Sequence, residues 1–224
     1  MQESQLISEE TTYHYNELPE HARQKARAHY IESWIYDDWY DHIYEDAKEE
    51  GASKGFDIDD IAFSGFWSQG DGAMWTGGVD LIQFITHHLP ESIGRECWIW
   101  LIQDGWVYDR ASIHRTSHHY SHSYCMGISG VEPAAYDEED RLNTDCILKG
   151  APIETLYNLI VADTACSIKD ISDLEELVLN EARRYADMIY GRLRDGYEYE
   201  CSDTQISESY DANYVLFNEE GKAI

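Results

Sequence analysis

Two helical patterns on either side of an aromatic middle region limit this chain to a mixed fold of helices and strands. In the first pattern, apolar residues recur every four positions from Ile31 to Ala47, which predicts one long acidic helix over residues 16–51. The second begins at Ser172, where Ser-Asp-Leu-Glu has the form of a capping box, and its apolar positions continue to Leu193. The less charged region between them is the expected core of a sheet.

The rest of the chain predicts shorter elements. Strands are expected at Ile58–Trp67, Cys97–Ile102, Trp106–Tyr108, Ile113–Ile128 and Tyr214–Phe217, and helices at Val79–Leu89 and after a cap at Ser202. We therefore predict an α+β fold, with an antiparallel or mixed sheet flanked by helices. Because no repeat and no Pro/Gly/Ser-rich linker occurs, a single domain over residues 16–224 is expected after a flexible start over residues 1–15.

The charge balance excludes several classes of protein. Sixteen Lys and Arg stand against 44 Asp and Glu, a formal charge of −28, so direct binding to nucleic acid or to an anionic membrane is not expected. No apolar run approaches the roughly 18–20 residues of a membrane span. Residues 1–10 lack the basic and apolar regions of a signal peptide. Five widely spaced cysteines without a C-x-x-C pair fit a reducing cytosol.

The acids of the first predicted helix are the candidate partner-binding residues. Residues 1–60 carry 16 acids and 5 bases. We assign to this surface the acids Asp37, Asp38, Asp41, Glu45 and Glu49, together with the interleaved aromatics Trp39 and Tyr40. At one phosphate per ~1.7 Å, the 28 uncompensated charges match about 48 Å of duplex DNA, which is the basis for a DNA-mimic hypothesis. The alternatives are a surface that only keeps the chain soluble, and aromatics that pack in a core.

A glycine-rich loop and a set of histidines are the other candidates for a site. Ser68, Gln69, Gly70, Asp71 and Gly72 follow a predicted strand, and they are interpreted either as a ligand-binding or catalytic loop or as a tight turn whose aspartate bonds its own backbone. His114, His118 and His122 would share one strand face. On a strand, four residues span about 13 Å, too far for a single ion, so no metal site is predicted. No catalytic residue and no cofactor is predicted either.

The segment Phe63–Ala73 resembles a run found in a family of small proteins encoded by bacteriophages. The shared motif is SGF-x-SQGDGA, from Ser64 to Ala73. Further similarity lies at Tyr120–Tyr124, Tyr197–Tyr199, Ser202–Asp203 and Ala212–Tyr214, so the resemblance covers about residues 57–224. It implies a phage origin but no settled activity or cofactor. The chain departs from the family pattern at Met74-Trp75, and the acidic helix before residue 51 looks like an addition.

Charge and resemblance together favour a non-enzymatic, phage-encoded inhibitor of a host protein, acting in the host cytoplasm by stoichiometric binding. The expected partner has a basic, nucleic-acid-binding surface and belongs to a restriction system or a similar defence. Two alternatives stay open: a small ligand- or metal-dependent enzyme built on Ser68–Gly72 and nearby histidines, and an antitoxin-like neutraliser. A homodimer is also left open.

Overall fold

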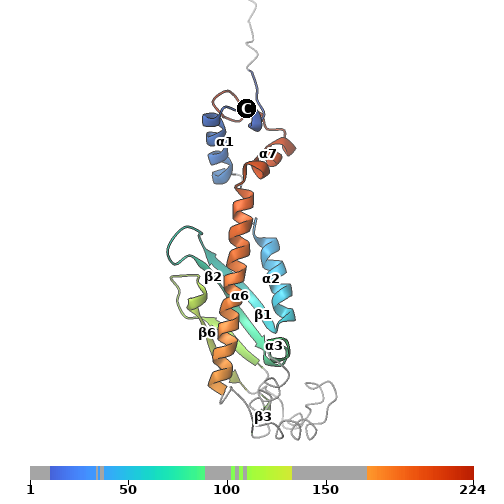
Figure 1. Cartoon of the computed structure of the whole chain (residues 1–224), viewed down its shortest axis with the longest axis vertical. Helices are drawn as coiled ribbons and strands as arrows, with labels where there is room; N and C mark the ends of the chain where they lie inside the picture. Colours follow the sequence, from blue (N-terminus) through green and yellow to red (C-terminus); the bar gives the residue numbers. More distant parts are fainter. Residues whose placement is uncertain are drawn as a thin grey trace, which may run out of the picture. The chain divides into compact units, whose positions relative to one another are not determined.

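The computed structural model describes residues 11–33, 35, 38–88, 102–103, 106–107, 110–132 and 171–224. The chain forms two compact units, one from Met1–Asp41 with Leu193–Ile224 and the other from His42–Arg192. The predicted α+β class is confirmed (Figure 1). The expectation of a single domain over residues 16–224 stays a prediction, since compactness alone does not say whether the units fold separately.

The larger unit is built on a four-stranded antiparallel sheet. Its strands lie in the order β1 (Phe56–Ser64), β2 (Gly72–Asp80), β5 (Arg110–Arg115) and β6 (Met126–Glu132). Two further short strands, β3 (Ile102–Gln103) and β4 (Trp106–Val107), pair with each other. Strand β2 was not predicted; of the predicted segment Cys97–Ile102, residues 97–101 lie outside the described residues.

Helices cover one face of this sheet: α2 (Asp41–Ser53), α3 (Leu81–His88) and α6 (Ile171–Glu200). Trp75 of β2 is fully buried, and its indole N–H donates to the Ala182 carbonyl of α6 at 3.1 Å. The Tyr185 hydroxyl donates to the Ala47 carbonyl at 2.7 Å, which ties α6 to α2. The burial alternates along β1, with Phe56 and Ile58 buried and the aspartates exposed, as expected for a sheet covered on one side.

The smaller unit joins the two terminal segments around an aromatic core. It contains η1 (Tyr15–Glu17), α1 (Glu20–Ser33) and α7 (Asp203–Ala212). The rings of Tyr15, Tyr30, Tyr210 and Phe217 pack together. Ser202 caps α7 as predicted, because its hydroxyl accepts the Gln205 N–H at 3.2 Å.

Three predictions about this unit need correction. One long helix over residues 16–51 is not found: the chain leaves α1 after Ser33, and α2 begins at Asp41. Since a step of four residues turns an α-helix about 40° past a full rotation, apolar residues repeated strictly every four positions do not stay on one face. The predicted strand Tyr214–Phe217 is reduced to bridges made by Phe217. The loose start ends earlier than residue 15, because Tyr13 pairs with Phe217 and Tyr15 is fully buried.

Candidate functional site

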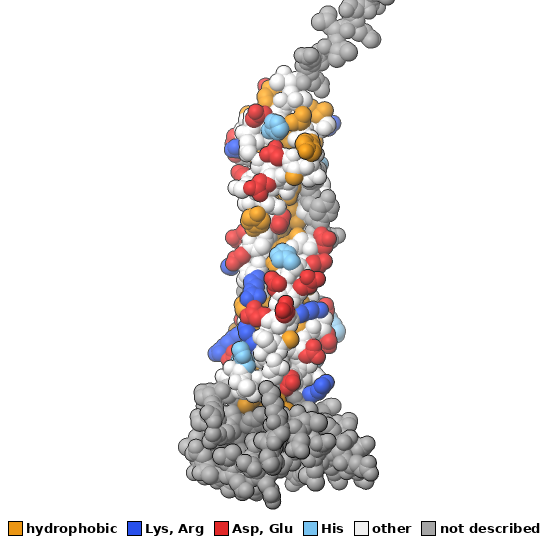
Figure 2. Space-filling model, turned by 90° about the vertical axis from the view of Figure 1, so that its right-hand side faces the viewer, with side chains coloured by type: hydrophobic (Ala, Val, Ile, Leu, Met, Phe, Trp, Pro, Cys, Tyr) orange, Lys and Arg blue, Asp and Glu red, His pale blue; other side chains and the backbone are white. Residues whose placement is uncertain are grey.

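Exposed carboxylates gather on α2 and on the neighbouring edge strand β1. We call this set the acidic surface: Glu45, Asp46, Glu49, Asp57, Asp59 and Asp60. The ammonium group of Lys48 donates to the Asp59 carbonyl at 2.8 Å, which holds the helix beside the strand. Within the described part of the chain, none of the six carboxylates has an ion-pair partner within 4 Å. Figure 2 shows many carboxylates on the side of the molecule that it faces, with Lys and Arg among them.

Glu50 of α2 is a contrasting case. Its two oxygens accept from Lys54 and Arg192, each at 2.6 Å. Hydrogen bonds from Lys54 and then from Arg192 hold the pKa of this carboxyl below its usual value. The charge of Glu50 is therefore used inside the fold, whereas the charges of the acidic surface remain available to a partner.

The structure does not bring the predicted partner-binding residues together in one described surface. Asp37 lies outside the described residues. Asp38, Trp39, Tyr40 and Asp41 fall in the smaller unit, and Glu45 and Glu49 in the larger one. Asp38 and Asp41 are exposed, but Trp39 and Tyr40 are half-buried, and the Trp39 ring packs on Tyr197 with centroids 5.7 Å apart. The aromatics of this segment therefore serve packing at least in part.

The loop from Ser68 to Gly72 is a tight turn. The Asp71 Oδ2 atom accepts the backbone N–H groups of Trp67 at 2.8 Å and of Ser68 at 2.6 Å. The Asp71 N–H donates to the Ser68 carbonyl, and Gly70 has a φ of +97°, which favours glycine. No printed hydrogen bond among the described residues links Ser68 or Gln69 to a histidine. This geometry agrees with the tight-turn interpretation of the motif.

The predicted histidine row does not lie on one strand. His114 belongs to β5, whereas His118 and His122 lie in the loop that follows it. The His122 Nδ1 atom accepts the Tyr124 N–H at 3.2 Å at the start of the short helix η2 (Ser123–Cys125), and its ring stacks on that of Tyr124. Within the described residues, no group of three or more His, Cys, Asp or Glu could hold a metal ion.

This loop and the glycine turn form an exposed aromatic patch, which we call the two-loop surface. It consists of loops 65–71 and 116–124, and its exposed rings are Trp67, Tyr120 and Tyr124. The guanidinium of Arg183 on α6 lies 5.9 Å from the centre of the Tyr124 ring. The sequence gives Trp67, Tyr120 and Tyr124 within the motif segments, but nothing there shows that the two loops meet.

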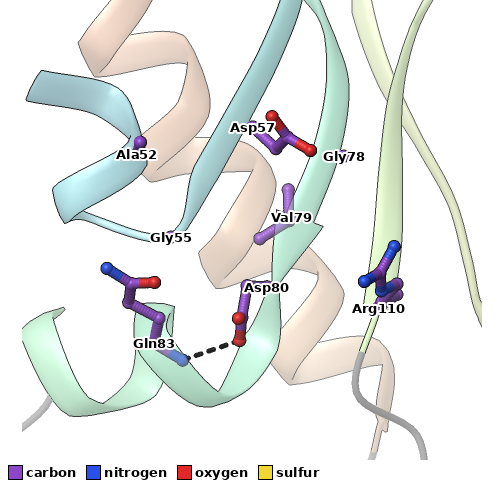
Figure 3. A pocket seen from close by; sticks show the side chains of 8 residues that line it. All are labelled: Ala52, Gly55, Asp57, Gly78, Val79, Asp80, Gln83 and Arg110. Atoms are coloured by element: carbon purple, nitrogen blue, oxygen red, sulfur yellow. Dashed lines mark hydrogen bonds between the residues drawn. The ribbon is translucent and has the colours of Figure 1, made fainter. Parts of the chain in front are cut away.

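A surface hollow of about 240 Å³ lies where β1, β2, β5 and α3 converge (Figure 3). Its polar lining comes from Asp57, Asp80, Gln83 and Arg110. Asp80 Oδ1 accepts the Gln83 N–H at 2.9 Å and so caps α3, and Asp80 pairs with Arg110 across β2 and β5. Each strand end is thus occupied with structural tasks, and the hollow presents no nucleophile beside a base.

The fold and these surfaces define an acidic α+β protein with a helix-covered antiparallel sheet. Residues 39–203 match the model of a domain of unknown function, DUF8835, and the chain belongs to this family. The matched region includes α2 with the acids of that helix. No curated protein and no solved structure matches the chain. None of the described helices has the length and apolar composition that crossing a membrane requires.

Proposed function

We propose that this chain is a non-catalytic protein that binds a basic, nucleic-acid-binding cleft of a host protein and thereby inhibits it. The resemblance of Ser64–Ala73 to a phage-encoded run makes a restriction enzyme, or another protein of anti-phage defence, the target that we favour. In the more specific version of this proposal, the carboxylates take the place of DNA phosphates in the cleft.

The observation that carries the proposal is the acidic surface with its six carboxylates. They have no ion-pair partner in the described part of the chain, and they lie on a helix and a strand held together by Lys48. A partner with a basic cleft gains their attraction without first breaking internal ion pairs. Such binding is fast, and salt weakens it, because the counterions released on association are held less favourably in dilute salt.

The test is inhibition of a purified restriction enzyme by the full chain, together with plating of unmodified phage on restricting bacteria that express the chain. We expect stoichiometric inhibition of DNA cleavage, weaker inhibition as salt rises, and higher plating efficiency. Displacement of a short DNA duplex from the enzyme is the additional result expected of mimicry. No inhibition of any restriction or defence nuclease tried would contradict the proposal.

A pair of charge-matched variants locates the effect. Glu45→Gln/Asp46→Asn/Glu49→Gln removes three charges from the acidic surface, and Glu208→Gln/Glu219→Gln/Glu220→Gln removes three exposed charges from the other unit. At about 0.2–1 kcal/mol per exposed charge pair, the first variant should bind roughly 3- to 100-fold more weakly. The second should bind almost as well as the unchanged chain. Equal losses in both would mean that net charge alone, and not the acidic surface, drives binding.

A further inference from the structure

The two-loop surface leaves three aromatic rings in water. Trp67, Tyr120 and Tyr124 are 74%, 60% and 77% exposed. The loops that carry them touch, because a Cβ atom added at Gly72 would lie only 2.7 Å from the His122 ring. Exposed apolar patches of this kind mark interaction sites, and Trp and Tyr are among the residues that contribute most at interfaces.

Charge indicates what covers this patch. The two loops contain one acid, Asp71, and its carboxylate already accepts two backbone N–H groups of its own loop. The nearby Arg115 and Arg183 donate to the carbonyls of Ser117 and Met126. The two-loop surface is therefore nearly neutral in a chain of charge −28. Two copies of so acidic a chain repel each other where carboxylates meet, but not where these loops meet.

The available area sets the strength of such a contact. A buried aromatic residue removes about 150–250 Å² from water, so three rings at these exposures remove on the order of 300–500 Å² per copy. Two copies together bury roughly 600–1,000 Å², less than the ~1,200–2,000 Å² of a stable interface. The contact is therefore weak and depends on concentration.

We infer that two copies of this chain associate reversibly through their two-loop surfaces, about a two-fold axis that sets ring against ring. Added salt strengthens this dimer, because it screens the repulsion between the acidic remainders and leaves the apolar contact intact. Salt has the opposite effect on the acid–base binding proposed above. The dimer does not depend on that function, and the two ideas can fail separately.

Sedimentation velocity of the full chain tests this inference, at micromolar to millimolar concentration and in about 0.01 to 0.5 M NaCl. We expect a monomer–dimer equilibrium whose dissociation constant falls severalfold as salt rises. Trp67→Ala/Tyr124→Ala should raise the dissociation constant about tenfold or more, as for truncation of interface anchors. Trp67→Phe keeps an aromatic ring and should retain most of the association.

A control removes exposed aromatics elsewhere. Tyr199→Ala/Tyr214→Ala, both in the smaller unit, should leave the dimer unchanged. Thermal unfolding of each variant verifies that the fold is intact. The inference is overturned by a chain that stays monomeric at millimolar concentration in high salt, by a dimer that salt weakens, or by a dimer that Trp67→Ala/Tyr124→Ala does not affect.

Discussion

At the scale of single residues, the surroundings of each carboxylate decide what its charge can do. Glu50 faces Lys54 and Arg192, and its charge stabilises the contact between α2 and α6. Glu45 and Glu49 lie on the same helix, but no such cation faces them in the described part of the chain. The difference comes from α6, more than 100 residues further along the chain, and the spacing of acids within α2 does not reveal it.

We predict that Glu50→Gln destabilises the fold at neutral pH and much less in acid. The folded-state pKa of Glu50 is lowered from its ordinary value of 4.5, so its stabilisation is complete above that value and is lost as the pH falls through the folded-state pKa. At neutral pH we expect a loss of up to about 1 kcal/mol, since the group is partly exposed. Urea unfolding at pH 7 and in acid measures it, with Glu49→Gln as the control. A loss that stays undiminished in acid would contradict the assignment.

At the scale of elements, the sequence predicts what local signals determine and misses what contacts determine. The capping residues at Ser172 and Ser202 correctly predict α6 and α7, and the turn at Asp71 follows from its own loop. Strand β2 was missed because Gly77 and Gly78 interrupt its pattern, although the sheet pairs them on both sides. The two-loop surface was missed for the same reason, since only the fold of the sheet brings together loops about 50 residues apart.

We predict that Gly77→Ala disrupts the pairing of β1 with β2. Gly77 has a φ of +153° beside the irregular register at Ile58/Asp60, and a Cβ atom there would lie 2.1 Å from the Asp57 carbonyl oxygen. Strain and backbone displacement should cost about 2 kcal/mol or more. Gly78→Ala is the matched control, because its Cβ meets nothing nearer than 3.7 Å. Denaturant unfolding compares them, and equal stabilities would refute this account of the bulge.

At the scale of the whole molecule, the excess of acids opposes compactness. A charge of −28 creates repulsion that extends over about 30 Å in 0.01 M salt but only about 3 Å in 1 M salt. The printed ion pairs of the described residues neutralise only a few of the 44 acids. Stability should therefore depend on ionic strength more than in a protein of balanced charge.

We predict that the unfolding temperature rises with NaCl concentration between about 0.01 and 1 M. The variant Glu45→Gln/Asp46→Asn/Glu49→Gln, which has less repulsion to screen, should start higher and rise less. Calorimetry at low protein concentration separates this effect from association. An unfolding temperature that falls as salt is added would show that ion pairs outweigh repulsion in this fold.

The aromatic core of the smaller unit has a consequence for synthesis on the ribosome. Tyr15 and Tyr30 pack against Tyr210 and Phe217, which are translated nearly 200 residues after the first of these rings. Domains usually form as soon as their segments emerge, but this one has to wait for the last part of the chain. The nascent N-terminal segment therefore carries its aromatic side chains unprotected through almost all of translation.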